Sequence, residues 1–319
     1  MVKIIENRNY RNWLLGKKVV SEYISLLSDN LINGLVLYDN ENSMTDKFKG
    51  ISNLEIAGSI DDLLDRVDGV HICSPNATHF EIIMKAMEKN VNVLVEKPIT
   101  TNSDDAFRLL EIALAKGLVF QVGNIFRFSN AMVEIKKLLD DDTIGNVVHL
   151  SFIWDHISPS PSSSNEDVIW DLMPHILDMI NFILGSWPRE IVSVSTKRGG
   201  IGETVNKSSD VLLYYGNNVY INVRISLSSH KTTREIEIQG KTGTIVFNPV
   251  AQNGWLYRSG KQQEIVMEPN NTILAEIKNF VECIAEKKIK INSAHLGALI
   301  IKEIEAIKRV EEIERSKKV

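Results

Sequence analysis

The pattern of apolar and polar positions between residues 70 and 98 predicts one complete strand, helix, strand unit. A short apolar run at 70–73 ends at Ser-Pro-Asn (74–76), where proline and asparagine favour a turn. Apolar residues then recur at helical spacing, and a second apolar run at 93–95 indicates a buried strand. Two such strands joined by a helix form a right-handed parallel crossover. The unit therefore delivers Glu-Lys-Pro (96–98) to the carboxyl end of its second strand, where open parallel sheets bind ligands.

The same alternation continues on both sides of this unit and predicts a first domain over residues 1–122. Apolar runs of strand length are separated by stretches in which apolar residues recur every three or four positions. The other expected strands cover 2–5, 35–38 and 118–122, and the other expected helices cover 17–27, 59–67 and 103–116. Strands that alternate with helices are typical of α/β proteins. We therefore expect a Rossmann-type, doubly wound parallel sheet.

After residue 122 the pattern changes, and we expect a second domain over residues 123–319. A predicted helix at 129–139 precedes segments in which apolar and polar residues alternate. These strands are expected at 147–154, 190–196, 211–215, 219–227, 234–239 and 244–247. Such alternation is typical of a mostly antiparallel sheet with one face on helices, so the domain should be α+β with a large open sheet. The other face needs a cover, and Val223 is one candidate for an apolar position on it.

The turn after the first strand departs from the pattern of dinucleotide-binding proteins. Such proteins carry G-x-G-x-x-G there, because the glycines let the backbone approach the pyrophosphate. Here only Gly16 can be placed, as the third glycine, and the turn is then several residues too long. Two interpretations remain open: Arg8 or Arg11 holds the pyrophosphate by charge, or the loop has lost its grip on a dinucleotide.

Asp39 ends the second predicted strand, 23 residues after Gly16. An acidic residue at this point in NAD-binding sheets accepts hydrogen bonds from the adenosine ribose and disfavours the 2′-phosphate of NADP. The alternative is an aspartate that makes a turn at a strand end. The position of Asp39 after a strand, helix, strand start favours the ribose contact.

Composition restricts the partners more than the fold. The 319 residues are 44% hydrophobic and 24% charged with a net charge of −5, which argues against nucleic acid or an anionic membrane as partner. No apolar run has transmembrane length and the start lacks the apolar stretch of a signal peptide, so we expect a cytoplasmic protein. Cys73 and Cys283 give neither a disulfide framework nor a metal-binding spacing, so we expect two buried packing residues and no metal site.

Three motifs in order carry a resemblance to a known family. The first is Ser-Pro-Asn-Ala-Thr-His (74–79), followed 17 residues after its histidine by Glu-Lys-Pro. The second is Gly-Asn-Ile-Phe-Arg-Phe-Ser (123–129), and the third is Asp-Leu-Met-Pro-His-Ile-Leu-Asp (171–178). Together they resemble the glucose-fructose oxidoreductase and inositol dehydrogenase family, abbreviated Gfo/Idh/MocA. The similarity covers nearly the whole chain from the second strand onward.

The resemblance implies that the first domain binds NAD. The residues expected to contact or border the cofactor are Gly16, Asp39, Ser74, Pro75, Asn76, His79, Glu96, Lys97 and Pro98. The family also uses the lysine of its Glu-Lys-Pro motif at the active centre and has a cis peptide bond before the proline. Without the resemblance, Asn76 is a helix N-cap and Lys97 is a surface lysine after a strand.

The third motif places three polar residues on one face of a predicted helix. Asp171 and His175 stand four residues apart, and His175 and Asp178 stand three apart. Pro174 is tolerated only in the first turn of a helix, which places Asp171 at the helix start. A histidine beside helix carboxylates is commonly a structural hydrogen-bonding group. The family resemblance, and the need of the reaction for a base that titrates near neutral pH, favour catalysis instead.

The function that the resemblance implies is NAD-dependent oxidation of a secondary hydroxyl, or the reverse reduction, on a sugar, a nucleotide-linked or other sugar derivative, or a cyclitol. His175 takes the hydroxyl proton, Asp171 orients the imidazole, and Lys97 donates a hydrogen bond to the same oxygen. Weaker candidates for substrate contacts are Arg127, Trp154, His156 and Asp178. The family also implies a homodimer or homotetramer that covers the open sheet face.

The alternative function is a non-catalytic family member that senses a sugar or a dinucleotide. The degenerate turn after the first strand favours this alternative. The presence of Lys97, Asp171 and His175 together favours the enzyme, because a sensor has no need for a base, its orienting group and an oxyanion donor.

Overall fold

The computed structural model describes residues 2–6, 10–40, 45–156, 167–198, 206–288 and 294–317. The chain divides into two compact units, and each is built from two segments of sequence. Unit 1 comprises Met1–Ile125 and Asn271–Lys302, and unit 2 comprises Phe126–Asn270 and Glu303–Val319.

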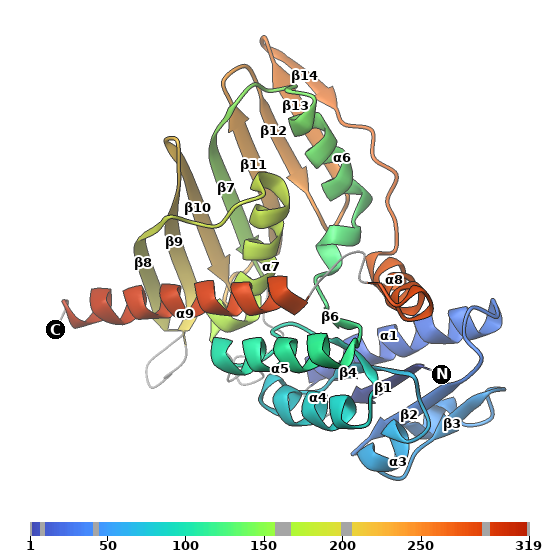
Figure 1. Ribbon diagram of the computed structural model, residues 1–319. Helices are drawn as coiled ribbons and strands as arrows, with labels where there is room; N and C mark the ends of the chain where they lie inside the picture. The colour runs from blue at the N-terminus through green and yellow to red at the C-terminus, as the bar shows by residue number, and fades with distance from the viewer. Residues whose placement is uncertain are drawn as a thin grey trace. The chain divides into compact units, whose positions relative to one another are not determined.

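Unit 1 contains a six-stranded parallel sheet of order β3-β2-β1-β4-β5-β6 (Figure 1). The strands are β1 (Val2–Glu6), β2 (Leu35–Asp39), β3 (Leu54–Ile56), β4 (Gly69–Cys73), β5 (Asn92–Val95) and β6 (Phe120–Val122). In this order the direction of winding reverses between β1 and β4, and doubly wound sheets bind ligands at that point. The predicted Rossmann-type sheet is therefore confirmed.

The helices of unit 1 begin and end at residues suited to those positions. Ser59 and Asn102 accept backbone hydrogen bonds at the starts of α3 and α5, and Gly117 ends α5 with a φ of 64°. The helices are α1 (Tyr10–Ser28), α3 (Ile60–Leu64), α4 (His79–Glu88), α5 (Ser103–Lys116) and α8 (Thr272–Glu286), and α9 (Ala294–Ser316) starts in this unit. None of the described helices in either unit combines the length and apolar character that a membrane-crossing segment requires.

α8 folds with unit 1 because its apolar side packs against α1 and the sheet. Phe280 and Cys283 of α8 lie in one buried cluster with Tyr23 of α1 and Cys73 of β4. Residues 271–302 therefore belong to unit 1, whereas the sequence pattern assigned everything after residue 122 to a second domain. The sequence pattern could not assign α8 to unit 1, because an apolar helix face is compatible with packing on either sheet.

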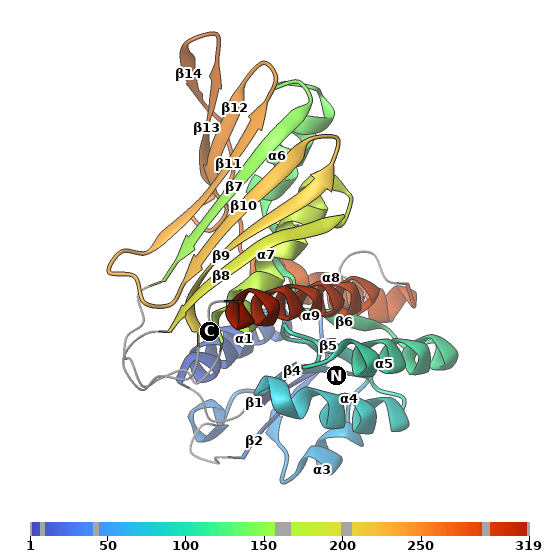
Figure 2. The same cartoon turned by 90° about the vertical axis from the view of Figure 1, so that its left-hand side faces the viewer.

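Unit 2 contains an eight-stranded sheet of order β14-β13-β12-β11-β7-β10-β9-β8 (Figure 2). Neighbouring strands pair antiparallel except β7 and β10, which are parallel. The strands are β7 (Val147–Asp155), β8 (Glu190–Arg198), β9 (Asn206–Gly216), β10 (Val219–Ser226), β11 (Thr233–Gly240), β12 (Thr244–Asn248), β13 (Asn253–Arg258) and β14 (Lys261–Glu264). The predicted large, mostly antiparallel sheet is confirmed. β13 and β14 escaped prediction because most of their residues are exposed and β14 has no apolar residue to alternate.

Helices cover one face of this sheet. α7 (Val168–Leu184) packs on β9 and β10, and α6 (Asn130–Asp140) packs on α7 (Figure 1). Phe152 and Trp154 of β7 point to this face and are at most 3% exposed, whereas Tyr220 of β10 lies on the opposite face and is 42% exposed. Val223 pairs with Phe152 and is 2% exposed, so its expected outward position was wrong. A period of two identifies two faces but does not say which one meets the helices.

Candidate active site

α7 carries the predicted catalytic pair on a helix whose start is capped. The carboxylate of Asp167 accepts a hydrogen bond from the backbone N–H of Ile169 at 2.9 Å, as an N-cap residue does. Asp171 lies in the first turn of the helix, and His175 lies one turn further along the same face. The capped start therefore fixes the backbone that carries both side chains.

Pro174 lies in a different turn from the one predicted. The helix begins at Val168 rather than near Asp171, so the proline falls in its second turn. Because proline has no N–H, it supplies no helix hydrogen bond to the carbonyl of Trp170. The sequence argument placed the proline too early because it treated a helix-interior proline as excluded.

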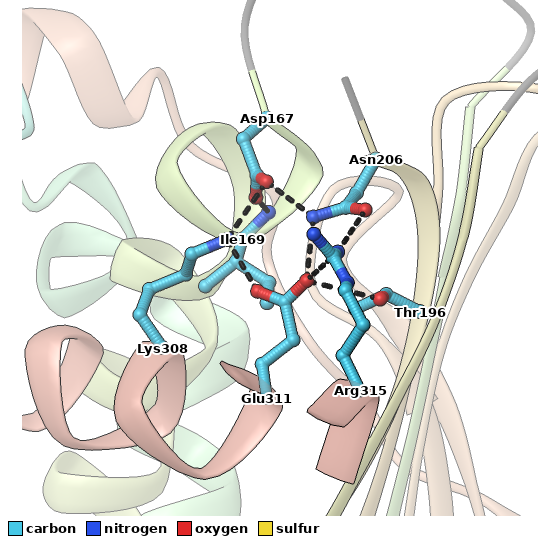
Figure 3. A network of polar contacts seen from close by, with 7 residues as sticks. All are labelled: Asp167, Ile169, Thr196, Asn206, Lys308, Glu311 and Arg315. Atoms are coloured by element: carbon cyan, nitrogen blue, oxygen red, sulfur yellow. Dashed lines mark hydrogen bonds and ion pairs between the residues drawn. The ribbon is translucent and has the colours of Figure 1, made fainter. Parts of the chain in front are cut away.

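A buried carboxylate on α9, Glu311, receives hydrogen bonds and ion pairs from four side chains (Figure 3). Asn206 donates to it at 2.8 Å and Thr196 at 3.0 Å, while Lys308 and Arg315 pair with it as cations. Glu311 itself is 2% exposed. Its charge is therefore compensated inside unit 2 by two cations and two neutral donors, as a buried carboxylate requires.

Two of these donors also bind the cap residue of α7. Lys308 donates to the carboxylate of Asp167 at 2.9 Å, and the side-chain amide of Asn206 donates to the same oxygen (Figure 3). Burial acts to lower the pKa of Lys308, but its hydrogen bonds and charge interactions with Glu311 and Asp167 raise that pKa overall. The start of α7 is thus held to α9 and β9 through shared donors.

Aromatic residues of unit 2 pack against the predicted base. The ring of Phe126 lies edge-to-face with His175, with ring centroids 5.4 Å apart, and makes a second edge contact with Trp154. The guanidinium of Arg234 lies 4.5 Å from the centre of the Trp154 ring. Trp154 is 3% exposed and packs on Phe126, and its predicted contact with substrate stays a prediction.

Arg127 and Asp178, two more predicted substrate contacts, pair with each other. Arg127 Nε donates to the Asp178 carboxylate at 2.6 Å, and another guanidinium N–H donates to the side-chain oxygen of Asn181 at 2.7 Å. Burial raises the pKa of Asp178 to about 6, against the opposing charge and hydrogen bond of Arg127. In the structure this pair fastens the 3₁₀ turn η3 (Ile125–Phe128) to α7.

His156, the fourth predicted substrate contact, is half-buried immediately after β7. Its backbone N–H donates to the carbonyl of Ser226 at 2.7 Å. It borders residues 157–166, which lie outside the described residues. Its contact with substrate stays a prediction.

In unit 1 the Ser-Pro-Asn motif forms a tight turn at the end of β4. The hydroxyls of Ser74 and Thr78 lie 2.7 Å apart, and Thr78 donates to the carbonyl of Pro75 at 2.8 Å. Pro75 and Asn76 are partly exposed on this turn, at the carboxyl edge of the sheet. They are therefore accessible to a ligand at the edge where such sheets bind one.

His79 was expected near the cofactor, and the structure places it inside the protein. It is fully buried, and its two ring nitrogens lie 2.8 Å from the carbonyl oxygens of Ser74 and Pro98. Burial lowers its pKa, although these backbone contacts oppose the shift. The imidazole joins the turn after β4 to the Glu-Lys-Pro segment. It therefore holds together two segments at the carboxyl edge of the sheet.

The Glu-Lys-Pro segment follows β5, and its Lys97–Pro98 bond is cis, as the family resemblance implied. Lys97 is half-buried. The carboxylate of Glu96 lies 3.4 Å from Nε2 of His71 on β4. It also lies so close to Gly123 that a Cβ added there would come within 2.9 Å of it. Glu96 therefore points into unit 1 toward β4.

β1 and α1 follow each other closely in the chain. β1 ends at Glu6, level with Asp39 on β2 and Cys73 on β4, and α1 begins only four residues later. Such a short turn sets a helix N-terminus beside the strand ends, which suits a pyrophosphate. Asp39 is 6% exposed at the end of β2. Gly16 lies inside α1 and cannot be the third glycine of this turn.

The boundaries of β1 and α1 also show which residues occupy the fingerprint positions. Counted from the end of β1, the three fingerprint positions fall on Asn7, Asn9 and Asn12. The sequence there reads N-x-N-x-x-N, with asparagine at each position where the fingerprint has glycine. Residues 7–9, including Arg8, lie outside the described residues.

The doubly wound sheet, the ligand-facing turn and the Asp-His pair on a capped helix are together the features of a nicotinamide-dependent oxidoreductase. Two family models match the chain accordingly. One, described as an oxidoreductase family with an NAD-binding Rossmann fold, matches residues 20–124, and the GFO/IDH/MocA C-terminal domain matches residues 132–246. The chain belongs to the Gfo/Idh/MocA family, as the three sequence motifs predicted.

Individual relatives are distant in sequence and close in fold. A 2,7-anhydro-N-acetylneuraminate hydratase from Mediterraneibacter gnavus is 26% identical over 67% of this chain and 60% of its own, so the match covers less than two thirds of that relative. A UDP-N-acetylglucosamine 3-dehydrogenase from Acidithiobacillus ferrooxidans is 26% identical over 71% of this chain and 73% of its own.

Solved structures extend the similarity over almost the whole chain. The structure of the Acidithiobacillus ferrooxidans dehydrogenase matches with a TM-score of 0.82 and 20% identity, and covers 97% of both chains. KijD10, a 3-ketoreductase from Actinomadura kijaniata in complex with NADP and TDP-benzene, matches with a TM-score of 0.85 and 18% identity over 97% of both chains. At these identities the match shows the shared fold.

The Glu311 network predicts a large stability difference between two adjacent positions. Glu311→Gln should lower the free energy of unfolding by about 2 kcal/mol, because a neutral amide in this buried position loses the ion pairs with Lys308 and Arg315 and part of the donor network. Glu312→Gln, at the exposed neighbouring position, should change it by less than about 0.5 kcal/mol. Urea unfolding followed by tryptophan fluorescence measures both, since Trp154, Trp170, Trp187 and Trp255 all lie in unit 2. Equal midpoints for the two variants would show that the network does not hold the unit together.

Proposed function

We propose that the protein is an NAD(P)-dependent dehydrogenase or reductase that acts on a secondary hydroxyl, or the matching ketone, of a sugar-like substrate. The observation that carries the proposal is the Asp171–His175 pair on the capped start of α7, in a chain of an oxidoreductase family. Relatives named as a dehydrogenase and a ketoreductase support catalysis over the sensing alternative.

In this proposal His175 accepts the substrate hydroxyl proton as the carbon gives up hydride. A hydroxyl cannot lose hydride to form a ketone unless its proton also leaves, so the reaction needs a base that titrates near neutral pH. Asp171, one helical turn earlier, stabilises the imidazolium that results. The edge contact of Phe126 limits rotation of the imidazole and so keeps it ready for transfer.

Lys97 donates a hydrogen bond to the same substrate oxygen and favours its alkoxide character. This assignment is supported by the family motif, in which the lysine follows a strand at the ligand-binding edge. Arg127 and Asp178 act as positioning residues in the proposal, because their charges hold η3 against α7.

A bound nicotinamide would accept the hydride, or return it in the reduction. Asp39 would accept hydrogen bonds from the adenosine ribose, and Ser74, Pro75 and Asn76 would border the nicotinamide end. We propose NAD rather than NADP, because a carboxylate at the end of β2 repels a 2′-phosphate. The location of Asp39 at the end of β2, level with the end of β1, supports this preference.

For the substrate we propose a nucleotide-linked or N-acetylated sugar. The dehydrogenase relative acts on UDP-N-acetylglucosamine, and the hydratase relative acts on an anhydro-N-acetylneuraminate. A cyclitol is the second candidate, since other relatives of the chain are named inositol 2-dehydrogenase.

We also propose a cytoplasmic homodimer or homotetramer. Cys73 and Cys283 are buried and form no disulfide, which suits a reducing compartment. On the face of the unit 2 sheet opposite α7, Tyr214 and Tyr220 pack with ring centroids 5.0 Å apart, and Tyr220 is 42% exposed. Exposed aromatic side chains on an open sheet face are suited to pairing with a second copy.

The catalytic proposal is tested with single substitutions. His175→Ala and Lys97→Ala should each lower kcat about 10²- to 10⁴-fold while leaving NADH affinity nearly unchanged. His230→Ala, at an exposed position of unit 2, is the matched control and should keep full activity. The assay follows NADH absorbance with UDP-N-acetylglucosamine and with inositol as substrates. Unchanged turnover of a substrate in both variants would refute the assignment.

The cofactor proposal predicts that NADH binds more tightly than NADPH, and that Asp39→Ala shifts the preference toward NADPH by removing charge repulsion. Asp29→Ala, on an exposed residue after α1, should leave the preference unchanged. Energy transfer from protein tryptophan to the reduced nicotinamide measures the affinities. If folded protein binds neither nucleotide at millimolar concentration, the dehydrogenase proposal fails and the sensing alternative replaces it.

The assembly proposal predicts a symmetric oligomer that a charge on the open face disrupts. Tyr220→Glu should convert it to smaller species, because pairing would bury the new carboxylate. Val266→Glu, at a residue that is 84% exposed outside the strands, should have no such effect. Sedimentation velocity at micromolar protein distinguishes these outcomes, and a monomeric wild-type protein contradicts the proposal.

A further inference from the structure

The strand register of unit 1 brings three metal-ligating side chains together on one face of its sheet. His71 and Cys73 stand two residues apart on β4, so they share a face. On the neighbouring strand β5, Leu94 pairs with His71, and Glu96 lies two residues further along the chain, just after the end of β5. The face is covered by α1 and α8, which contribute Tyr23 and Phe280 to the buried cluster around Cys73.

The three ligand atoms are close enough to bind one cation. Nε2 of His71 lies 3.4 Å from Oε1 of Glu96, and the imidazole nitrogen, the Cys73 sulfur and the carboxylate oxygen lie within 4.8 Å of one another. Tetrahedral zinc with bonds of about 2.0 Å to nitrogen and oxygen sets these two atoms about 3.3 Å apart. The nitrogen and oxygen therefore already have ligand spacing, and a rotamer adjustment of Cys73 would complete it.

The state of His71 differs from that of the other fully buried histidine of unit 1. Both nitrogens of His79 lie 2.8 Å from carbonyl oxygens. Nε2 of His71 is buried without a hydrogen-bond partner of acceptable geometry among the described residues, although the side chain is 0% exposed. A buried polar atom in this condition costs stability unless something binds it.

The outer contact of the cluster suits a metal ligand. The hydroxyl of Tyr23 lies 3.5 Å from Nδ1 of His71, the ring nitrogen on the side away from Glu96. Metal-bound histidines usually contact such a polar group through their second nitrogen, which fixes the ring.

We propose that His71, Cys73 and Glu96 form a binding site for a divalent transition-metal cation, with Zn²⁺ the best match to one nitrogen, one sulfur and one oxygen ligand. Binding releases the Cys73 thiol proton to solvent and forms a metal–thiolate bond. The side chain of Glu96 is 12% exposed, so a water or a ligand from the carboxyl edge of the sheet takes the fourth position. The bound cation fixes the residue that precedes Lys97.

Cobalt titration of the wild-type protein tests the proposal, after removal of metal with a chelator and dialysis. Co²⁺ substitutes for Zn²⁺ in tetrahedral sites and gives a thiolate-to-metal charge-transfer absorption in the near ultraviolet. We expect saturation at one equivalent of Co²⁺ per chain, and loss of the absorption when Zn²⁺ is added. His71→Gln should weaken Co²⁺ binding by more than the roughly tenfold that loss of an outer contact costs.

The two buried cysteines of unit 1 provide a matched pair of variants. Cys73→Ser should abolish the charge-transfer absorption, and Cys283→Ser should retain it, because Cys283 lies in the same apolar cluster but outside the ligand set. Far-ultraviolet circular dichroism verifies folding of each variant. The wild-type titration alone overturns the proposal if folded protein shows no thiolate absorption or binds well below one equivalent. The measurement uses no substrate or nicotinamide, so it is independent of the proposed catalysis.

Discussion

The buried charge of Glu311 ties together three elements of unit 2. A carboxylate that is 2% exposed is stable only if donors surround it, and those donors come from α9 itself and from β8 and β9. Lys308 and Asn206 also donate hydrogen bonds to Asp167, which caps α7. The start of the helix that carries His175 is therefore held by a residue 143 positions after Val168, the first residue of that helix.

The middle of α7 is nearly all apolar and buried, and polar contacts anchor the helix at two points. These two contacts lie toward opposite ends of the helix. Asp167 fixes the first turn, and the Arg127–Asp178 pair with Asn181 fixes the helix near its other end. His175 lies between these points, against Phe126. A catalytic side chain needs this kind of support, because a small displacement removes it from its reacting proton.

Sequence reasoning recovered what periodicity and motif spacing encode. The strands at the core of both sheets, the α5 helix and the Asp171–His175 spacing follow from local pattern. It missed features that depend on distant partners. Local pattern did not show that Trp154 and Asp178 are buried and contact Phe126 and Arg127, and their predicted contacts with substrate stay predictions. β14 has no apolar residue, so only its pairing with β13 makes it a strand. The place of Gly16 could be settled only once the ends of β1 and α1 were known.

The interleaving of the two units has a consequence for how the protein is made. The chain passes from unit 1 to unit 2 after Ile125 and returns only at Asn271, so α8 emerges from the ribosome after the whole sheet of unit 2. At about 5–20 residues per second, about 10 to 40 seconds pass between the synthesis of β4 and that of Phe280, which will cover its face. During that interval an apolar parallel sheet lacks one of its covering helices. Unit 1 can therefore complete its core only after the sheet of unit 2 has been synthesised.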